Sequence, residues 1–132
     1  HLAPVLAGAL QELGIRVPVC AVLSRTPPVA DVVAGECRLL VDPPQANLSD
    51  AVAEAGADVV VGSGLGQMAA LRAHAGLVEV GYPCNETHFL ADAPWCGFEG
   101  VLHLVQRVVR EWSGARARAD FTGLYERPGK AG

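Results

Sequence analysis

Residues 57–66 read Ala-Asp-Val-Val-Val-Gly-Ser-Gly-Leu-Gly, and this stretch decides the fold. The run of valines is typical of a buried β-strand, because β-branched side chains pack well on a pleated surface. Gly62, Ser63 and Gly64 then predict a turn, which leads into a helix over residues 65–74. A strand that turns directly into a helix is one half of a βαβ unit, so the stretch predicts an α/β protein.

The alternation of strand and helix continues on both sides of this stretch. Apolar residues at helical spacing predict an amphipathic helix over 2–13, which Gly14 ends in a left-handed conformation. The other expected elements are strands over 17–23, 38–41, 57–61 and 77–80, a short helical turn after Pro27-Pro28, a helix capped by Asn47 or Ser49 that runs to about residue 55, and a helix over 98–112. This order predicts a Rossmann-like three-layer sandwich with a mainly parallel sheet of about four strands. Such a domain normally starts with a strand, so we expect the first strand to be missing.

The last expected helix has two unlike faces. The apolar face carries Val101, Leu104, Val105, Val108 and Trp112, and the opposite face carries His103, Gln106, Arg107, Arg110 and Glu111. We expect His103, and His74 on the preceding helix, to be solvated. From residue 113 onward Gly, Ala, Arg and Pro dominate, so we expect a domain over 1–112 and a flexible or interface tail over 113–132.

Composition excludes several classes of protein. Hydrophobic residues make up 51% of the chain and charged residues 18%, which is too apolar for a disordered protein. The net charge of −4 has the wrong sign for binding nucleic acid through counterion release. The longest apolar runs are broken before the roughly 18 residues that a membrane span needs. We therefore expect a cytoplasmic protein with no nucleic-acid or membrane partner.

In parallel sheets ligands bind beyond the carboxyl ends of the strands, so the loops there are the candidate sites. The turn of Gly62, Ser63 and Gly64 is one such place, because backbone N–H groups at the start of a helix can hold an anion. The alternative is a tight turn whose glycines need positive φ angles, and this is the interpretation we favour.

Residues 81–96 form the second candidate site. The candidate residues near a cofactor are Cys84, Glu86, His88 and Cys96. Cys84 and His88 could form a nucleophilic pair, or Cys84, His88 and Cys96 could bind a metal, or His88 could be a hydrogen-bonded structural residue. The four cysteines contain no C-x-x-C pair, and Cys20 and Cys37 lie in strand-like runs that predict buried, unreactive thiols.

Four features follow one another in a characteristic order. They are Asp42 after a short strand, the stretch from Ala57 to Gly64, the run Val78-Glu79-Val80-Gly81-Tyr82-Pro83, and Pro94-Trp95-Cys96-Gly97-Phe98-Glu99-Gly100 before an amphipathic helix. Together they resemble the C-terminal domain of nitrogenase component 1 type oxidoreductases over about residues 2–112. The spacing between Gly-Tyr-Pro and Gly-Phe-Glu-Gly is similar to that of the family's β-type subunits.

This resemblance implies the last of three Rossmann-like domains in a subunit that pairs with a homologous α-type or β-type subunit. An ATP-dependent iron protein would supply electrons. The intact complex would hold an iron–sulfur cluster or metallocofactor, or bind a tetrapyrrole, and the isolated fragment would hold none and be inactive. In α-type subunits a histidine of the matching loop ligates the cofactor's heterometal, and His88 is the histidine at that place. β-type subunits do not supply that ligand, and Cys84 and Cys96 depart from the family pattern.

Three functions therefore remain open at this point. The first is a domain of a nitrogenase-like component 1 subunit, which acts in reduction or in cofactor assembly. The second is a stand-alone module that binds a small ligand or nucleotide at the turn of Gly62 to Gly66. The third is a purely structural dimerisation domain.

Overall fold

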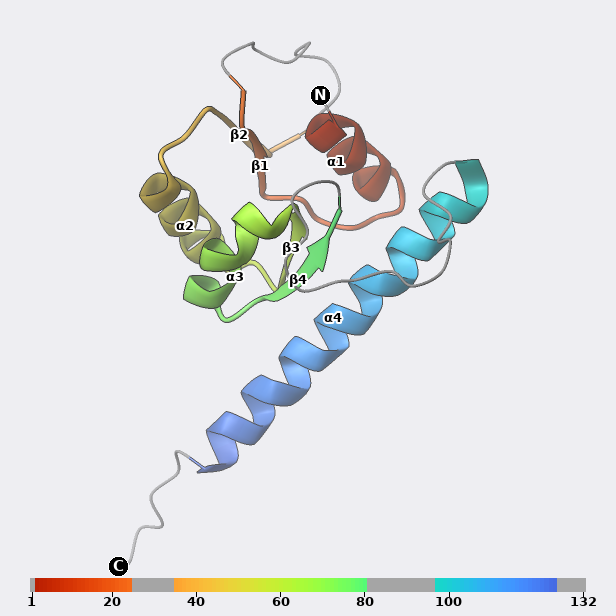
Figure 1. Ribbon diagram of the computed structural model, residues 1–132. Helices are drawn as coiled ribbons and strands as arrows, with labels where there is room; N and C mark the ends of the chain where they lie inside the picture. The colour runs from red at the N-terminus through yellow and green to blue at the C-terminus, as the bar shows by residue number, and fades with distance from the viewer. Residues whose placement is uncertain (1, 25–34, 81–96, 126–132) are drawn as a thin grey trace, which may run out of the picture.

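The computed structural model describes residues 2–24, 35–80 and 97–125 of the chain (Figure 1). The elements in chain order are α1 (Leu2–Glu12), β1 (Val19–Val22), β2 (Arg38–Val41), α2 (Gln45–Glu54), β3 (Val59–Gly62), the 3-10 helix η2 (Gly64–Gly66), α3 (Gln67–Ala73), β4 (Gly76–Glu79) and α4 (Gly97–Tyr125). From β2 onward strands and helices alternate as the sequence predicts, and the α/β class is confirmed. The short helical turn predicted after Pro27-Pro28 lies outside the described residues.

All four strands pair in parallel, in two separate pairs. β1 pairs with β2, from Val19 opposite Arg38 onward, and β3 pairs with β4, from Val59 opposite Gly76 onward. The expected sheet of about four strands is thus present as two sheets of two strands among the described residues. Side chains rather than ladder hydrogen bonds connect the pairs, because Ala21 of β1 and Val60 of β3 belong to one apolar cluster.

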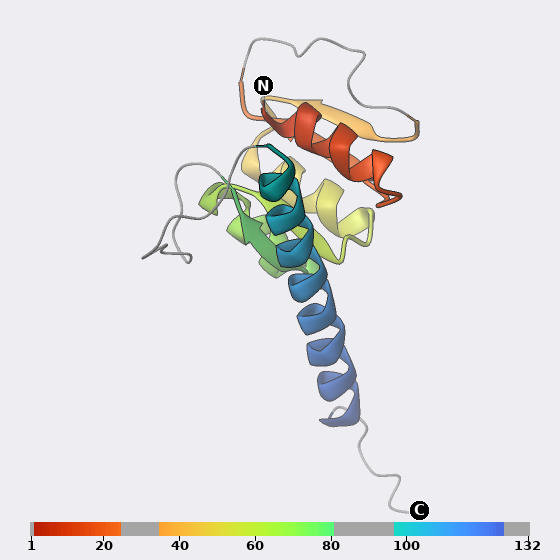
Figure 2. The same ribbon diagram turned by 90° about the vertical axis from the view of Figure 1, so that its right-hand side faces the viewer.

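The fold has three layers, as Figure 2 shows, with α1 and α4 on one side of the strands and α2 and α3 on the other. Successive residues of β3 point to opposite faces of the sheet, as strand geometry requires. Val59 and Val61 pack in the cluster beneath α1 and α4, which is built on Leu10, Val78, Leu104 and Val108. Val60 packs on the other face in the cluster of Leu48, Val52 and Ala69. The predicted three-layer sandwich is confirmed.

The ends of two helices illustrate what local sequence controls. Gly14 follows α1 with a φ of 79°, so the predicted left-handed stop is confirmed. The predicted cap of α2 at Asn47 or Ser49 is wrong. The helix begins at Gln45 after Pro44, which makes no side-chain capping bond, and Ser49 is buried within it. Proline is tolerated directly before a helix, because its ring fixes φ and Pro44 has a φ of −54°.

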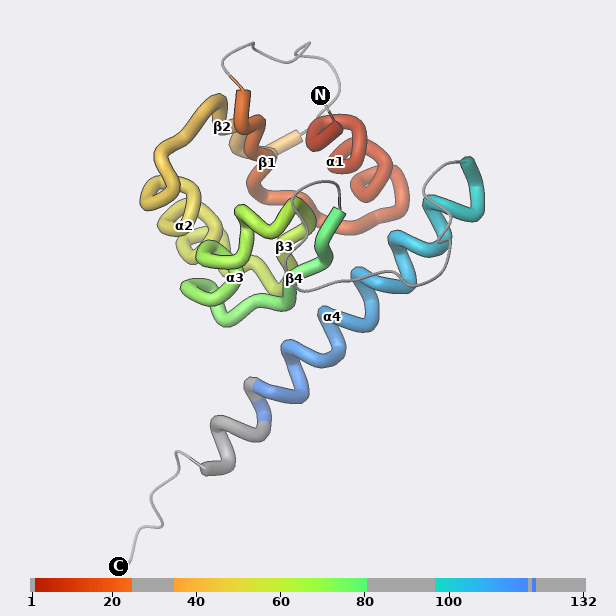
Figure 3. Tube along the Cα trace, in the orientation of Figure 1, coloured from red at the N-terminus to blue at the C-terminus, as the bar shows by residue number. Residues whose placement is uncertain are grey.

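The last helix is longer than the sequence predicts. α4 runs to Tyr125, so residues 113–125 are helical instead of starting a tail without periodicity. The tube in Figure 3 follows this helix from beside β4 to a point well clear of the body. Gly76 at the start of β4 permits its close approach, because a Cβ there would lie 2.9 Å from Cβ of Glu111 and 3.0 Å from its carbonyl oxygen. Among the described helices, α4 included, none combines the length and apolar character that a bilayer span requires.

Candidate functional site

The carboxyl ends of β3 and β4 lie side by side and form the centre of the candidate site. Gly62, the last residue of β3, is opposite Glu79, the last residue of β4. The backbone N–H of Val80 donates to the carbonyl oxygen of Gly62 at 2.7 Å, which extends the ladder by one bond. The turn of residues 62–64 therefore adjoins the point where residues 81–96 leave the sheet.

The glycines of this turn are not required for positive φ angles, so the interpretation favoured from the sequence is wrong. The glycines with positive φ in the described part of the chain are Gly14, Gly35, Gly56 and Gly97. Gly66 has a φ of −77°. A glycine is needed there because it has no side chain: a Cβ at this position would lie 3.2 Å from Cγ1 of Val60. Close packing of the turn on β3 explains this glycine.

One backbone donor just after this turn is already used within the chain. Ser63 makes no side-chain capping bond, and the N–H of Gly66 already donates to the carbonyl oxygen of Ser63 at 2.9 Å. η2 has three residues and α3 has seven, so the helix dipole behind the turn is short. Anion binding by Gly62, Ser63 and Gly64 stays a prediction.

Two buried charged residues lie at this edge, and the sequence did not single them out. The side chain of Glu79 is almost completely buried, with 1% of the residue exposed, and Arg107 of α4 is 9% exposed. Nη1 of Arg107 donates to the backbone carbonyl oxygen of Glu79 at 2.8 Å. Hydrogen bonds from charged donors are stronger than neutral ones, so this contact ties α4 firmly to the end of β4.

The expectation that Arg107 lies opposite the packed face of its helix is wrong, because Arg107 is buried. Leu104, Arg107 and Val108 are all buried, together with Ala115, and α4 contacts both β3 and β4 along this side. The buried side is wider than the apolar positions alone indicate, because residue 107 lies about 60° around the helix from residue 104, on the side away from residue 108. Trp112, expected on the buried face, is 39% exposed.

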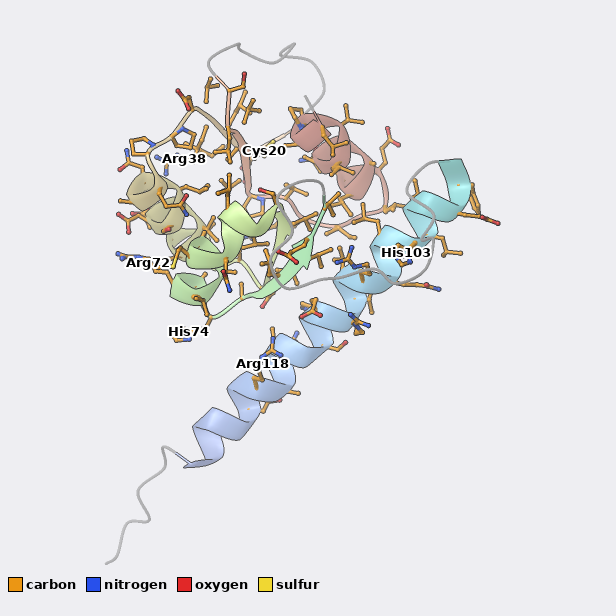
Figure 4. The ribbon with its side chains drawn as sticks, viewed as in Figure 1. Cys20, Arg38, Arg72, His74, His103 and Arg118 are labelled. Carbon is orange, nitrogen blue, oxygen red and sulfur yellow. The ribbon has the colours of Figure 1, made fainter. Side chains whose placement is uncertain are left out.

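The two histidines of the described helices differ in environment (Figure 4). His74 follows α3 in a left-handed conformation with a φ of 53° and is exposed, as predicted. His103 lies one turn before Arg107 on α4 and is half-buried, with its Nε2 atom shielded from solvent. The prediction of a solvated His103 is therefore wrong, because its environment within the fold covers the ring nitrogen.

Cys84, Glu86, His88 and Cys96 all lie outside the described residues. Their segment leaves the sheet after Val80 and returns to the described chain at Gly97, the first residue of α4. Within residues 2–24, 35–80 and 97–125, no three His, Cys, Asp or Glu side chains gather where they could hold a metal ion. The predicted metal ligation and the nucleophilic pair stay predictions.

The two described cysteines have raised pKa values. Cys20 is buried in β1, as predicted. The same prediction is wrong for Cys37, which lies just before β2 and is half-buried. Burial raises the pKa of the Cys20 thiol to about 11, with a smaller contribution from Cys37, and burial also raises the pKa of Cys37. Both groups are thiols at neutral pH, and a thiol is a poor nucleophile and metal ligand.

A depression between α2 and α3 has a volume of about 480 Å³ and lies in the other helical layer. It is lined by Gln45, Ala46, Ser49, Met68, Leu71 and Arg72. Arg72 is paired with Asp50 at 2.6 Å, so its charge is already balanced. This surface supplies no group suited to catalysis.

One sequence signal could have revealed the buried pair. Val78-Glu79-Val80 places a carboxylate inside an apolar strand, and a charge in such a position is buried only with a partner that compensates it. The contact of Arg107 with the backbone carbonyl oxygen of Glu79 could not be identified in advance, because Arg107 lies 28 residues further along the chain.

Comparison with protein families gives one match. The model of the family described as Nitrogenase component 1 type Oxidoreductase matches residues 1–113, which is most of the chain. The resemblance drawn from the sequence motifs is confirmed. No curated protein and no solved structure matches this chain.

Proposed function

Because the chain belongs to the nitrogenase component 1 type oxidoreductase family, we propose that it is a domain of a component 1 subunit that covers a redox cofactor. The cofactor is an iron–sulfur cluster or metallocofactor, or the site receives a tetrapyrrole. The subunit acts in ATP-linked multi-electron reduction or in assembly of the cofactor. Its partners are a homologous subunit and an ATP-dependent iron protein.

The observation that carries this proposal is the place where the segment of residues 81–96 is attached. It starts beside the turn of residues 62–64, at the carboxyl edge of a parallel strand pair, which is where α/β proteins bind ligands. It ends at α4, which Arg107 ties to the end of β4. Both attachment points therefore belong to one well-packed unit.

The donor types of this segment fit an iron-based cofactor. Cys84, His88 and Cys96 offer sulfur and imidazole ligands, the types that bind iron in proteins, and Glu86 offers oxygen. When bound, the cofactor supplies the redox chemistry. The described residues lack a metal-ligand cluster of their own, so we assign them the task of holding and shielding this segment.

Glu79 and Arg107 carry most of that task in our proposal. Both are buried, so they remove water from the edge of the sheet where the segment is attached. The hydrogen bond from Arg107 to the carbonyl oxygen of Glu79 sets the direction in which the chain leaves β4. A rigid attachment reduces the number of conformations from which a ligand must be recruited.

The proposal is tested by replacing His88 in the complex purified without oxygen. His88→Asn should lower cofactor content, measured as iron per complex and as visible absorbance, and lower turnover with it. His74→Asn is the matched control, because His74 is exposed and asparagine tolerates its left-handed backbone. Equal cofactor content and turnover in wild type and His88→Asn would remove His88 from the site.

Nucleotide titration separates this function from a stand-alone nucleotide-binding module. We expect isothermal titration of the chain with ATP or NAD to give no saturable heat. Saturable binding that Gly64→Val abolishes, in a variant whose circular dichroism is unchanged, would favour the nucleotide module instead.

A further inference from the structure

α4 carries a second apolar stripe that the body of the protein leaves uncovered. Phe98, Leu102, Val105, Val109 and Trp112 follow one another at alternating intervals of four and three residues, and we name these five residues the α4 seam. Phe98 is 87% exposed, Leu102 52% and Val109 50%. This spacing keeps the residues on one side of a helix and is the spacing by which helices pair.

The seam is distinct from the side of α4 that packs on the sheet. That side consists of Leu104, Arg107, Val108 and Ala115, which are all buried against the strands. At 100° per residue, the buried residues and the seam lie on different sides of the helix. Packing within the chain therefore explains one apolar side of α4 and leaves the other unexplained.

We propose that the α4 seam pairs two copies of this chain through antiparallel α4 helices. The pattern of intervals continues to Arg116 and reads the same in both directions from residue 107. In the antiparallel arrangement Leu102 meets Trp112 of the second copy, and Val105 meets Val109 of the second copy. Each apolar residue between the ends of the seam thus meets another apolar residue.

Charge identifies a second copy as the occupant and sets the direction of pairing. Glu99 adjoins the first residue of the seam, and Arg116 follows its last, held 5.2 Å above the ring of Trp112. Antiparallel pairing brings Arg116 of each copy to Phe98 and Glu99 of the other, which joins a cation to an aromatic ring and a carboxylate. Parallel pairing would place Arg116 against Arg116 and Glu99 against Glu99.

The shape of the molecule leaves this side of α4 accessible. Figures 1 and 2 show the carboxyl half of α4, which carries Trp112 and Arg116, extending away from the other helices and strands. The body packs on the side of Leu104 and Val108, so two bodies would lie on opposite sides of the helix pair. From residue 98 to residue 116 the two helices would be in contact over about 28 Å.

The test is the oligomeric state of the full chain, measured by sedimentation equilibrium up to about 100 μM, where even a weak dimer forms. We expect a dimer. Leu102→Glu should raise its dissociation constant about a hundredfold, because the lost apolar contact occurs twice in a symmetric pair. Leu71→Glu is the matched control, since Leu71 is 63% exposed on α3, and it should leave the dimer intact.

Charge reversal tests the direction of pairing. Glu99→Arg and Arg116→Glu should each weaken the dimer, and the double variant should restore it, because the double change recreates both opposite-charge contacts between antiparallel copies. A chain that is monomeric at the highest concentration overturns the proposal. So does a dimer that Leu102→Glu leaves intact, or a double variant as weak as the two single variants. None of these outcomes depends on the redox function proposed above.

Discussion

Gly76→Ala should destabilise the fold by forcing α4 away from β4. The added Cβ would lie 2.9 Å from Cβ of Glu111 and 3.0 Å from its carbonyl oxygen, closer than side-chain atoms pack in real proteins. The obstacle includes backbone, so it cannot be relieved by a change of rotamer. Relief requires α4 to move by several tenths of an ångström, away from contacts that include the bond from Arg107 to Glu79.

The expected magnitude follows from two opposing terms. Overpacking a tight site costs about 1–3 kcal/mol, and replacing glycine by alanine within a strand returns about 0.5–1 kcal/mol of backbone entropy. The net loss should be about 1–2 kcal/mol. For a domain of this size that corresponds to a fall in melting temperature of roughly 4–8 °C.

Urea unfolding followed by far-ultraviolet circular dichroism measures the effect. Gly62→Ala is the matched control, because Gly62 ends the neighbouring strand, has no positive φ and has open space where its Cβ would lie. It should be neutral or slightly stabilising. If Gly76→Ala unfolds at the same urea concentration as Gly62→Ala, then α4 does not approach β4 as closely as described.

Three further predictions concern other features of the fold. Arg107→Leu should lower the free energy of unfolding in urea by about 2–4 kcal/mol, because it removes a buried charged donor. Arg110→Leu is the control and should lower it by under about 0.5 kcal/mol, because Arg110 is exposed. Equal losses in the two variants would contradict the burial of Arg107. Cys20 should resist alkylation at pH 8 in the folded chain and react once urea unfolds it. Because the pKa of the Cys20 thiol is raised from 9.0 to about 11, the free energy of unfolding should fall as pH rises from 9 to 11. Rapid alkylation of Cys20 in the folded protein would refute the burial of this thiol. Gly14→Ala should cost about 1–2 kcal/mol through its φ of 79° alone, since its Cβ meets open space, and unchanged stability would exclude that backbone conformation.

Local patterns predicted the strands and the end of α1 well. Residues 38–41 were predicted as a strand and form β2 with the same bounds, because a short apolar run between turn residues has few alternatives. Gly14 ends α1 as predicted, because few residues other than glycine adopt its backbone conformation. Such features depend on neighbours in the sequence.

The errors come from contacts between distant parts of the chain. Arg107 was placed on the polar face of its helix because a helical pattern shows only which residues are polar. Its burial is favourable because it donates to the carbonyl oxygen of Glu79, which lies in β4, far away in the sequence. The end of α4 was missed because Gly114 and its neighbours lack an apolar period, yet the helix continues through them. Of the candidate site, the turn at residues 62–64 could be placed from its sequence, whereas the buried pair beside it could not.

Gly76 meets α4 at the midpoint of the helix, beside Glu111. Glu111 stands 14 residues from each end of the helix, since α4 runs from Gly97 to Tyr125. Each arm is therefore about 21 Å long. If α4 tilted by about 10° around Glu111 as a rigid body, the two ends of the helix would move by about 4 Å in opposite directions. Such a tilt would have to break the packing of Leu104 and Val108, and it would displace Gly97, where the segment with the candidate cofactor ligands rejoins the helix.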